Sequence, residues 1–211
     1  MKKKKLIIIG AGGHSGVVVQ EILKNNQFQI IGFVDDKIKN NKDYNIIGNL
    51  DFLIKKFKNK KINLFCAIGD IKSRLKIIKK IEKNKIKVKW VKIISKDAKV
   101  FQNVKIGDGT LVVTGSIINI NSTIGKHSII NTNASIDHDC RICDFVNISP
   151  GVSIAGYTTI NNNSFIGIGA SIKERIIIEN NVTIGANSFV NKNCKKEKTY
   201  FGSPIKLYKN K

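Results

Sequence analysis

The sequence predicts two domains, a Rossmann-like α/β domain followed by a parallel β-helix. The β-helix is indicated by sixteen consecutive positions, each six residues after the last, that all hold valine or isoleucine. These positions are Val100, Ile106, Val112, Ile118, Ile124, Ile130, Ile136, Ile142, Ile148, Ile154, Ile160, Ile166, Ile172, Ile178, Ile184 and Val190. A period of six fits neither the helical period of 3.6 nor strand alternation, whereas stacked β-helix coils produce it. The α/β domain is indicated by apolar runs that alternate with helical patterns in the first 95 residues.

In the α/β domain, strands are expected at residues 5–9, 29–34, 62–68 and 87–94. Helices are expected at residues 17–24, 50–57 and 72–84. Strands that alternate with helices imply βαβ units on a parallel sheet. We therefore expect the Rossmann-like domain to cover residues 1–95 and the β-helix, with a C-terminal tail, to cover residues 96–211.

The repeat has a second feature, a small or β-branched residue two positions before most of the valines and isoleucines. Such residues are Ala98, Thr110, Ser116, Ser122, Ser128, Ala134, Thr158, Ser164, Ala170 and Ser188. We expect each branched side chain to point into the β-helix and each small one to lie near a corner. Cys140 occupies one of these small-residue positions. The Cys140–Cys143 pair is therefore interpreted as structural, because no second pair completes a zinc site.

The formal charge of +22 raises nucleic acid as a possible partner. However, only three arginines occur, and lysine, isoleucine and asparagine are all abundant, which indicates compositional bias of an AT-rich genome. We expect no nucleic-acid partner, and small anionic ligands suit the charge better. No apolar run approaches the ~20 residues of a membrane span. The basic start followed by four apolar residues lacks the features of a signal peptide, so a cytoplasmic protein is expected.

A glycine-rich turn, Gly-Ala-Gly-Gly-His-Ser-Gly at residues 10–16, follows the first expected strand. Glycines here let the backbone approach a phosphate, and the next helix offers its N-terminal N–H groups. Asp35 and Asp36 end the second strand, about where an acid binds ribose in dinucleotide enzymes. Because the spacing departs from G-x-G-x-x-G, the turn indicates either a nucleotide-phosphate site or a tight structural turn. It does not establish a nicotinamide cofactor.

Three histidines occur, His14, His127 and His138. His138 lies between Asp137 and Asp139 and two residues after inward Ile136, which places it near a corner. Flanking carboxylates can fix the imidazole tautomer, so His138 is either a general base or a structural residue. His127 is interpreted as a surface residue. A zinc hydratase would need three histidines from neighbouring coils, and only two lie in the repeat, so no metal site is predicted.

These residues resemble a known family, the bacterial sugar acetyltransferases with a left-handed β-helix, and specifically the group of sialic acid O-acetyltransferases and UDP-4-amino-sugar N-acetyltransferases. The resemblance covers nearly the whole chain. It rests on residues 9–14, 33–37, 67–70 with Arg74, 131–132, 136–140 and 201–204. The combination of an N-terminal domain with the hexad motif is more specific than either part alone.

The resemblance implies which residues bind the substrates. The nucleotide-linked sugar is expected at Gly12, Gly13, His14, Asp35, Asp36, Lys37, Gly69 and Arg74, with Asn131 facing the sugar. His138 is implied as the general base and Asp139 as its partner. Acetyl-CoA is expected in a groove between subunits of a homotrimer, along Asn147, Gly156, Ile168 and Ala186. Asn147 departs from the family, where a histidine is frequent, and the segment 173–175 lacks a proline common there.

The function expected is N-acetylation of a nucleotide-linked amino sugar in bacterial surface glycan biosynthesis, and a UDP-linked 4-amino sugar is the expected acceptor. The acetyl group would pass directly from acetyl-CoA to the amine, without a covalent acetyl-enzyme. One alternative is O-acetylation of sialic acid or a related sugar, but free sialic acid carries no diphosphate for the glycine-rich turn. Another is a noncatalytic scaffold that binds nucleotide sugars, against which the His138–Asp139 pair argues.

Overall fold

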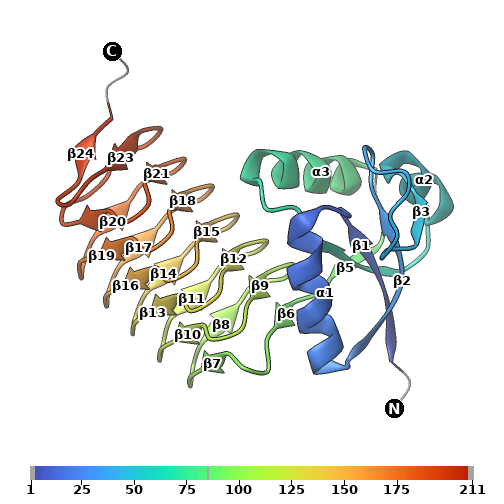
Figure 1. Ribbon diagram of the computed structural model, residues 1–211, viewed down its shortest axis with the longest axis horizontal. Helices are drawn as coiled ribbons and strands as arrows, with labels where there is room; N and C mark the ends of the chain where they lie inside the picture. The colour runs from blue at the N-terminus through green and yellow to red at the C-terminus, as the bar shows by residue number, and fades with distance from the viewer. Residues whose placement is uncertain (1–2, 85, 209–211) are drawn as a thin grey trace. The chain divides into compact units, whose positions relative to one another are not determined.

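A computed structural model describes residues 3–84 and 86–208 and divides the chain into two compact units, residues 1–93 and 94–211. The first unit is a parallel sheet with the strand order β3-β2-β1-β4-β5 and with helices between strands (Figure 1). Its elements are β1 (Lys4–Ile9), α1 (Gly13–Asn25), β2 (Phe28–Val34), β3 (Ile46–Gly48), α2 (Leu50–Lys56), β4 (Ile62–Cys66), α3 (Ile71–Lys83) and β5 (Val88–Trp90). This order, with β1 at the centre, is the Rossmann-like arrangement that the sequence predicts.

The second unit is a parallel β-helix of two-residue strands from β6 to β22, and within this repeat each strand pairs with the strand three hexads further on, as Ile118 pairs with Ile136. At its end the three-residue β23 pairs parallel with β21 and antiparallel with β24. One sheet contains β7 (Lys99–Val100), β10 (Ile117–Ile118), β13 (Ser135–Ile136), β16 (Ser153–Ile154), β19 (Ser171–Ile172) and β22 (Phe189–Val190). The next contains β8 (Lys105–Ile106), β11 (Thr123–Ile124), β14 (Arg141–Ile142), β17 (Thr159–Ile160) and β20 (Ile177–Ile178). The last contains β6 (Ile93–Ile94), β9 (Leu111–Val112), β12 (Ile129–Ile130), β15 (Asn147–Ile148), β18 (Phe165–Ile166), β21 (Thr183–Ile184), β23 (Thr199–Phe201) and β24 (Lys206–Leu207). Three hexads therefore make one coil.

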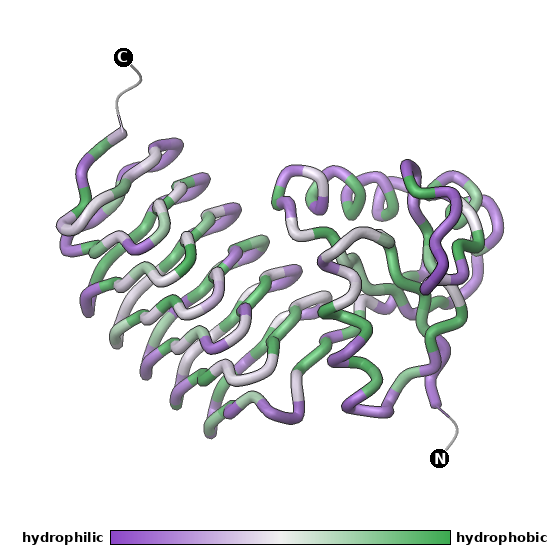
Figure 2. Tube along the Cα trace, viewed as in Figure 1, coloured by the Kyte–Doolittle hydropathy of each residue, from purple (hydrophilic) through white to green (hydrophobic). Residues whose placement is uncertain are grey.

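The interior of the β-helix is built from the hexad residues, which are buried from Val112 to Val190. Apolar and polar residues accordingly alternate around each coil (Figure 2). Val100 and Ile106 remain partly exposed because they lie in the edge strands β7 and β8. The prediction that the branched residues point inward, and the predicted fold class, are confirmed.

The small corner residues form hydrogen bonds that link one coil to the next. The hydroxyl of Ser122 donates to the carbonyl of Asp137 at 2.7 Å and accepts from the N–H of Cys140 at 3.0 Å. Equivalent donations to a carbonyl of the following coil occur at Thr110, Ser116, Ser128, Thr158 and Ser164. Cys140 takes the same place, with its Sγ 3.3 Å from the carbonyl of Ala155, and burial raises its thiol pKa to about 11. Buried polar groups are thereby satisfied at the corners.

From Val100 to Ile184, each inward residue is followed three positions later by a corner residue with left-handed backbone geometry, with φ between 52° and 77°. These residues are Asn103, Gly109, Gly115, Asn121, His127, Asn133, Asp139, Phe145, Gly151, Tyr157, Asn163, Gly169, Arg175, Asn181 and Asn187. Glycine, asparagine and aspartate tolerate this conformation, whereas bulky side chains rarely adopt it. Phe145, Tyr157 and Arg175 are therefore exceptions to the local preference, whereas histidine, as at His127, is among the residues that are enriched there.

The prediction that His127 is a surface residue is wrong, because its side chain is buried to 4% exposure. Its ring stacks on Phe145, one coil further on, with ring centroids 5.1 Å apart. Gly109, one coil earlier, leaves the space that the imidazole occupies. Residues one coil apart lie against one another in this fold, so a corner side chain can be covered by the neighbouring coils.

The structure differs from the expected elements at both ends of the repeat. The last strand expected, residues 87–94, is divided: β5 ends at Trp90, and β6 joins the β-helix, so that Ile94 begins the hexad series before Val100. After Val190 the hexad register stops, as expected, but the coil continues. Ile178 pairs with Cys194 and Ile184 with Tyr200, so this final coil is shorter than the three hexads of the others. The sequence also did not reveal β3.

We expect Ser122→Ala to destabilise the β-helix by about 1–3 kcal/mol, because a buried N–H and a buried carbonyl lose their partner. Thermal or denaturant unfolding of the full chain measures the change. Ser153→Ala is the matched control, since Ser153 is exposed on β16; its effect should lie within about 0.5 kcal/mol. Equal stability of the two variants would show that the corner hydroxyls do not hold the coils together.

Candidate active site

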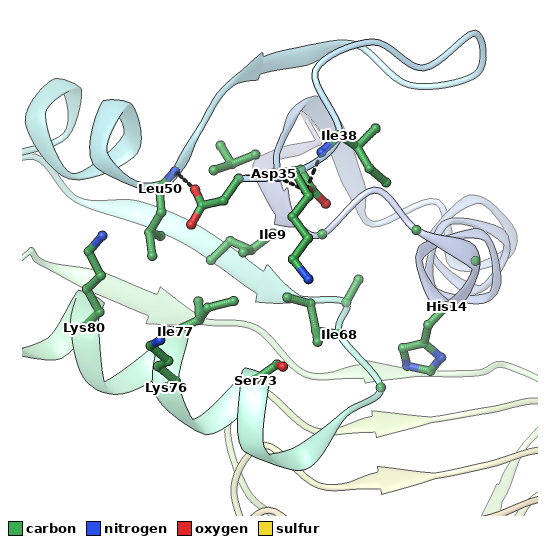
Figure 3. Close-up of a pocket in the computed structure, with 18 residues that line it drawn as sticks. Ile9, His14, Asp35, Ile38, Leu50, Ile68, Ser73, Lys76, Ile77 and Lys80 are labelled. Atoms are coloured by element: carbon green, nitrogen blue, oxygen red, sulfur yellow. Dashed lines mark hydrogen bonds between the residues drawn. The ribbon is translucent and has the colours of Figure 1, made fainter.

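The α/β unit contains a pocket of about 560 Å³ where β1 and β4 end side by side. The chain leaves β1 toward α1 and leaves β4 toward α3, and this is the topological switch point at which open α/β sheets bind ligands. Figure 3 shows residues of both loops and of α3 around the pocket. Those predicted from the sequence are Gly12, Gly13, His14, Asp35, Asp36, Lys37 and Gly69.

The glycine-rich turn leaves open space at the start of α1. The N-cap is Gly12, which offers no side-chain cap, and a Cβ placed on Gly12 or Gly13 meets no atom within 4 Å. The first-turn N–H groups of a helix attract anions through their partial positive charge. This end of the pocket therefore suits a phosphate.

Asp35 acts as a structural support of the pocket. Its carboxylate accepts hydrogen bonds from the N–H groups of Ala11, Lys37 and Ile38, at 2.8–2.9 Å. Partial burial opposes ionisation, but the three hydrogen bonds outweigh it and lower the pKa of Asp35 below its ordinary value. Asp36 accepts a hydrogen bond from the N–H of Leu50 at 2.8 Å. The acidic pair thus ties the end of β2 to the glycine-rich turn and to α2.

Arg74 does not line the pocket, because its side chain is almost fully buried on α3. Its guanidinium donates to the carbonyls of Ile68 at 2.7 Å and Gly69 at 2.9 Å, which fixes the loop after β4. Burial lowers the pKa of Arg74 to about 10, so it stays cationic at neutral pH. Burial and the charge of Arg74 both lower the pKa of His14, whose Nε2 is buried without a hydrogen-bond partner among the described residues.

Side chains from α3 complete the pocket, and the sequence did not single them out. Ser73, Lys76, Ile77 and Lys80 line it (Figure 3), and Lys80 also forms an ion pair of 2.7 Å with Asp51. Each of these four residues lies three or four positions from two of the others, so helical spacing could have shown that they share one face of α3. Only the position of β4 beside β1 shows that this face lines a pocket.

The β-helix places His138 at the corner after β13. Its side chain is 41% exposed, and its Nδ1 lies 2.9 Å from Oδ2 of Asp139. The N–H of His138 donates to Oδ1 of Asp137 at 2.8 Å. With Nδ1 held by a carboxylate, Nε2 is the ring nitrogen left to exchange a proton with a bound molecule.

The neighbouring coils orient this pair. Asn121 is one coil before Asp139 and donates from Nδ2 to Oδ1 of Asp139 at 3.3 Å, while Oδ2 faces the imidazole. Gly156 is one coil after His138, and a Cβ there would lie 2.7 Å from the imidazole Cε1. The absence of a side chain at Gly156 therefore makes room for the ring. Sequence reasoning missed Asn121, although its place three hexads before Asp139 is the signal that could have found it.

The residues expected to bind acetyl-CoA lie at different places in the chain. Gly156 belongs to the His138 corner, whereas Ile168 and Ala186 are exposed and lie one coil apart at another corner. Asn131 follows β12 at that second corner, and its Oδ1 accepts from the N–H of Thr132. Asn147 is buried to 9% exposure in β15. Within one chain these residues do not form one site.

Two family models match the chain, the PglD N-terminal domain over residues 5–81 and the bacterial transferase hexapeptide repeats over residues 157–192. The acetyltransferase domain of PglB from Neisseria gonorrhoeae, solved with acetyl coenzyme A, is 29% identical with a TM-score of 0.90, over 98% of this chain and all of that one. PerB from Caulobacter crescentus, solved with CoA and GDP-perosamine, is 29% identical with a TM-score of 0.90, over 97% of both chains. The chain is homologous to left-handed β-helix sugar acetyltransferases. The resemblance stated from the sequence is confirmed.

Curated relatives match over a shorter region. A GDP-perosamine N-acetyltransferase of Escherichia coli O157:H7 is 35% identical over 77 residues, which are 36% of this chain and 35% of that protein. The matched region thus spans about a third of the curated relatives' length. In the described residues, no helix is long and apolar enough to cross a membrane, and no cluster of three or more metal-ligating side chains is found.

We expect Asp35→Asn to lower the melting temperature at neutral pH, because the amide is uncharged and its oxygen is a weaker acceptor for the three N–H groups. The pKa of Asp35 is depressed in the folded state, so its stabilisation is present above the unfolded value of about 4 and is lost as the pH falls through the folded value. Melting curves of both proteins between pH 7 and pH 3 should therefore converge. A difference independent of pH would contradict the ionic role of Asp35.

Proposed function

We propose that this protein is an acetyl-CoA-dependent N-acetyltransferase that acts on a nucleotide-linked amino sugar. The observation that carries the proposal is the His138–Asp139 pair, held at an exposed corner by Asn121 and Gly156. The homologous structures, which hold acetyl coenzyme A or CoA with GDP-perosamine, support the same reaction class. The pocket of the α/β unit supplies an anion-binding site for the nucleotide.

The acetyl group passes directly from the thioester to the sugar amine. The neutral amine attacks the thioester carbonyl, and Nε2 of His138 takes a proton from the nitrogen as the C–N bond forms. Asp139 holds Nδ1–H and stabilises the imidazolium that results. The tetrahedral intermediate then expels the CoA thiolate, which takes up a proton, and the amide product forms. Cys140 is buried with a raised pKa, which argues against a covalent acetyl-cysteine intermediate.

The acceptor is a nucleoside diphosphate sugar, and the sequence resemblance favours a UDP-linked sugar. The open N-terminus of α1 and the amines of Lys37 and Lys76 suit a diphosphate. A GDP-linked sugar is the competing acceptor, because solved relatives contain GDP-perosamine. A free sialic acid would leave this cationic pocket without a diphosphate, which disfavours O-acetylation.

A homotrimer fits the distribution of the site residues. The His138 corner and the corner with Ile168 and Ala186 are separate in one chain, so both can line one groove only if two subunits meet. Ile117, Phe165, Ile177 and Phe189 supply exposed apolar area on the β-helix faces. Repeated heterologous contacts close into a ring when the rotation between neighbouring subunits divides the full turn, and a rotation of one third of a turn gives a trimer. Light scattering should give three times the 23.5 kDa chain mass, and a monomer would remove the shared groove.

We expect His138→Ala to fold normally and to lose acetyl transfer by about 10²–10⁴-fold, the usual contribution of a positioned base. Asp139→Asn should lose less, because Asp139 orients the imidazole and does not touch the amine. Release of CoA thiol with a UDP- or GDP-linked amino sugar measures turnover, and melting temperatures check folding. Turnover near that of the wild type in His138→Ala would exclude His138 as the base.

We expect Gly13→Val to raise the KM for the nucleotide sugar while the KM for acetyl-CoA stays unchanged, because the new side chain fills the space at the start of α1. Gly16→Ala is the control on the same helix, since Gly16 does not line the pocket and its Cβ would meet only the Tyr44 hydroxyl, at 3.4 Å. Calorimetric titration with UDP- and GDP-sugars identifies the base. Acetylation of free sialic acid without nucleotide-sugar binding would favour the O-acetyltransferase alternative.

A further inference from the structure

At the corner that contains His138, two further side chains, Tyr157 and Arg175, stack beside the imidazole and have no role in the proposed reaction. Asp139, Tyr157 and Arg175 follow one another at intervals of three hexads, so each lies one coil from the next. The His138 and Tyr157 rings meet at 88° with centroids 5.1 Å apart. The Arg175 guanidinium carbon lies 4.5 Å from the centre of the Tyr157 ring.

Both Tyr157 and Arg175 occupy the left-handed corner position, with φ of 58° and 60°. Asn103 and Asn121 hold the same position in the two earlier coils, where asparagine meets the backbone preference. A tyrosine and an arginine at this φ oppose that preference and therefore cost stability. Backbone conformations that a residue rarely adopts concentrate at functional sites, where the surrounding structure maintains them.

The stack is exposed, so core packing does not account for it. Tyr157 is 49% exposed, and Arg175 is also exposed. Among the described residues, the Arg175 guanidinium has no hydrogen-bond or ion-pair partner, and it lies over the Tyr157 ring. An arginine over an aromatic face is held by electrostatic attraction to the ring. The Arg175 contact therefore restricts Tyr157, and the Tyr157 ring in turn limits the space of the imidazole.

We propose that Tyr157, held by Arg175, is a positioning residue that fixes the imidazole of His138 for proton transfer. Asp139 holds Nδ1, and the backbone of Gly156 lies against the Cε1 and Nε2 side of the ring. Neither contact by itself prevents the half-exposed ring from rotating about its side-chain bonds. The perpendicular Tyr157 ring supplies the third contact. This inference rests on the proposed role of His138 as the base.

The test replaces Tyr157 with a residue that suits the left-handed backbone but lacks the ring. Tyr157→Asn should keep or raise the melting temperature and lower kcat by about 10–100-fold, as a displaced catalytic group does. The KM values for both substrates should stay within about twofold, because the interaction matters only in the transition state. Tyr157→Phe should restore most of the rate, and Arg175→Asn should lower kcat to a lesser degree. Tyr157→Gly serves as a second ringless variant.

Phe145→Asn is the matched control, because it replaces an aromatic residue with asparagine at the same backbone position of another corner. It should retain wild-type kcat. Unchanged kcat in both Tyr157→Asn and Tyr157→Gly, or an equal loss of kcat in Phe145→Asn, would overturn the inference. A change confined to KM would also overturn it, since Tyr157 would then be a binding residue. If His138→Ala is inactive while Tyr157→Asn is normal, only the positioning role fails, whereas an active His138→Ala removes the proposed function itself.

Discussion

The β-helix depends on one constraint, which holds in every coil but the last: a coil length of three hexads with a left-handed residue at the corners. Because strands of neighbouring coils pair in register, every strand residue contacts its counterpart one coil away. The corner hydroxyls satisfy the buried backbone groups that this winding creates. The same constraint builds the His138 site, since Asn121 reaches Asp139 and Gly156 makes room for the imidazole only through this spacing. The repeat that packs the interior of the β-helix therefore also places the residues that surround His138.

The pocket of the α/β unit depends on a different constraint. The loops after β1 and β4 must stay apart at the switch point of the open sheet. Asp35 accepts three backbone N–H groups on one side, and Arg74 donates to two carbonyls on the other. Both charged groups hydrogen-bond to the backbone of the loops, which fixes the two sides of the pocket, and Lys37 and Lys76 line the space between them. A rigid pocket with cationic groups binds an anionic ligand with little reorganisation.

The sequence determined the fold class because its evidence is periodic and local. The hexad series predicts coils without any knowledge of distant contacts, and the alternation of strands and helices predicts the parallel sheet. Part of the candidate site was also grouped correctly in space: Gly12, Gly13 and His14 line one pocket, and Asp139 lies beside His138, while the roles of these residues remain predictions. The sequence could group these residues because each motif places them within a few positions of one another or in a fixed period.

Tertiary structure decided what depends on contacts across the sheet or between coils. The burial of His127 follows from its stack with Phe145, and the supporting role of Arg74 follows from where the loop after β4 passes. The lysines of α3 face a pocket only because β4 lies beside β1. Likewise, Tyr157 meets His138 because the chain completes one coil and returns to the same corner. The sequence shows the position of a side chain within a repeat or helix. Its neighbours in space depend on how segments that are distant in the sequence pack together.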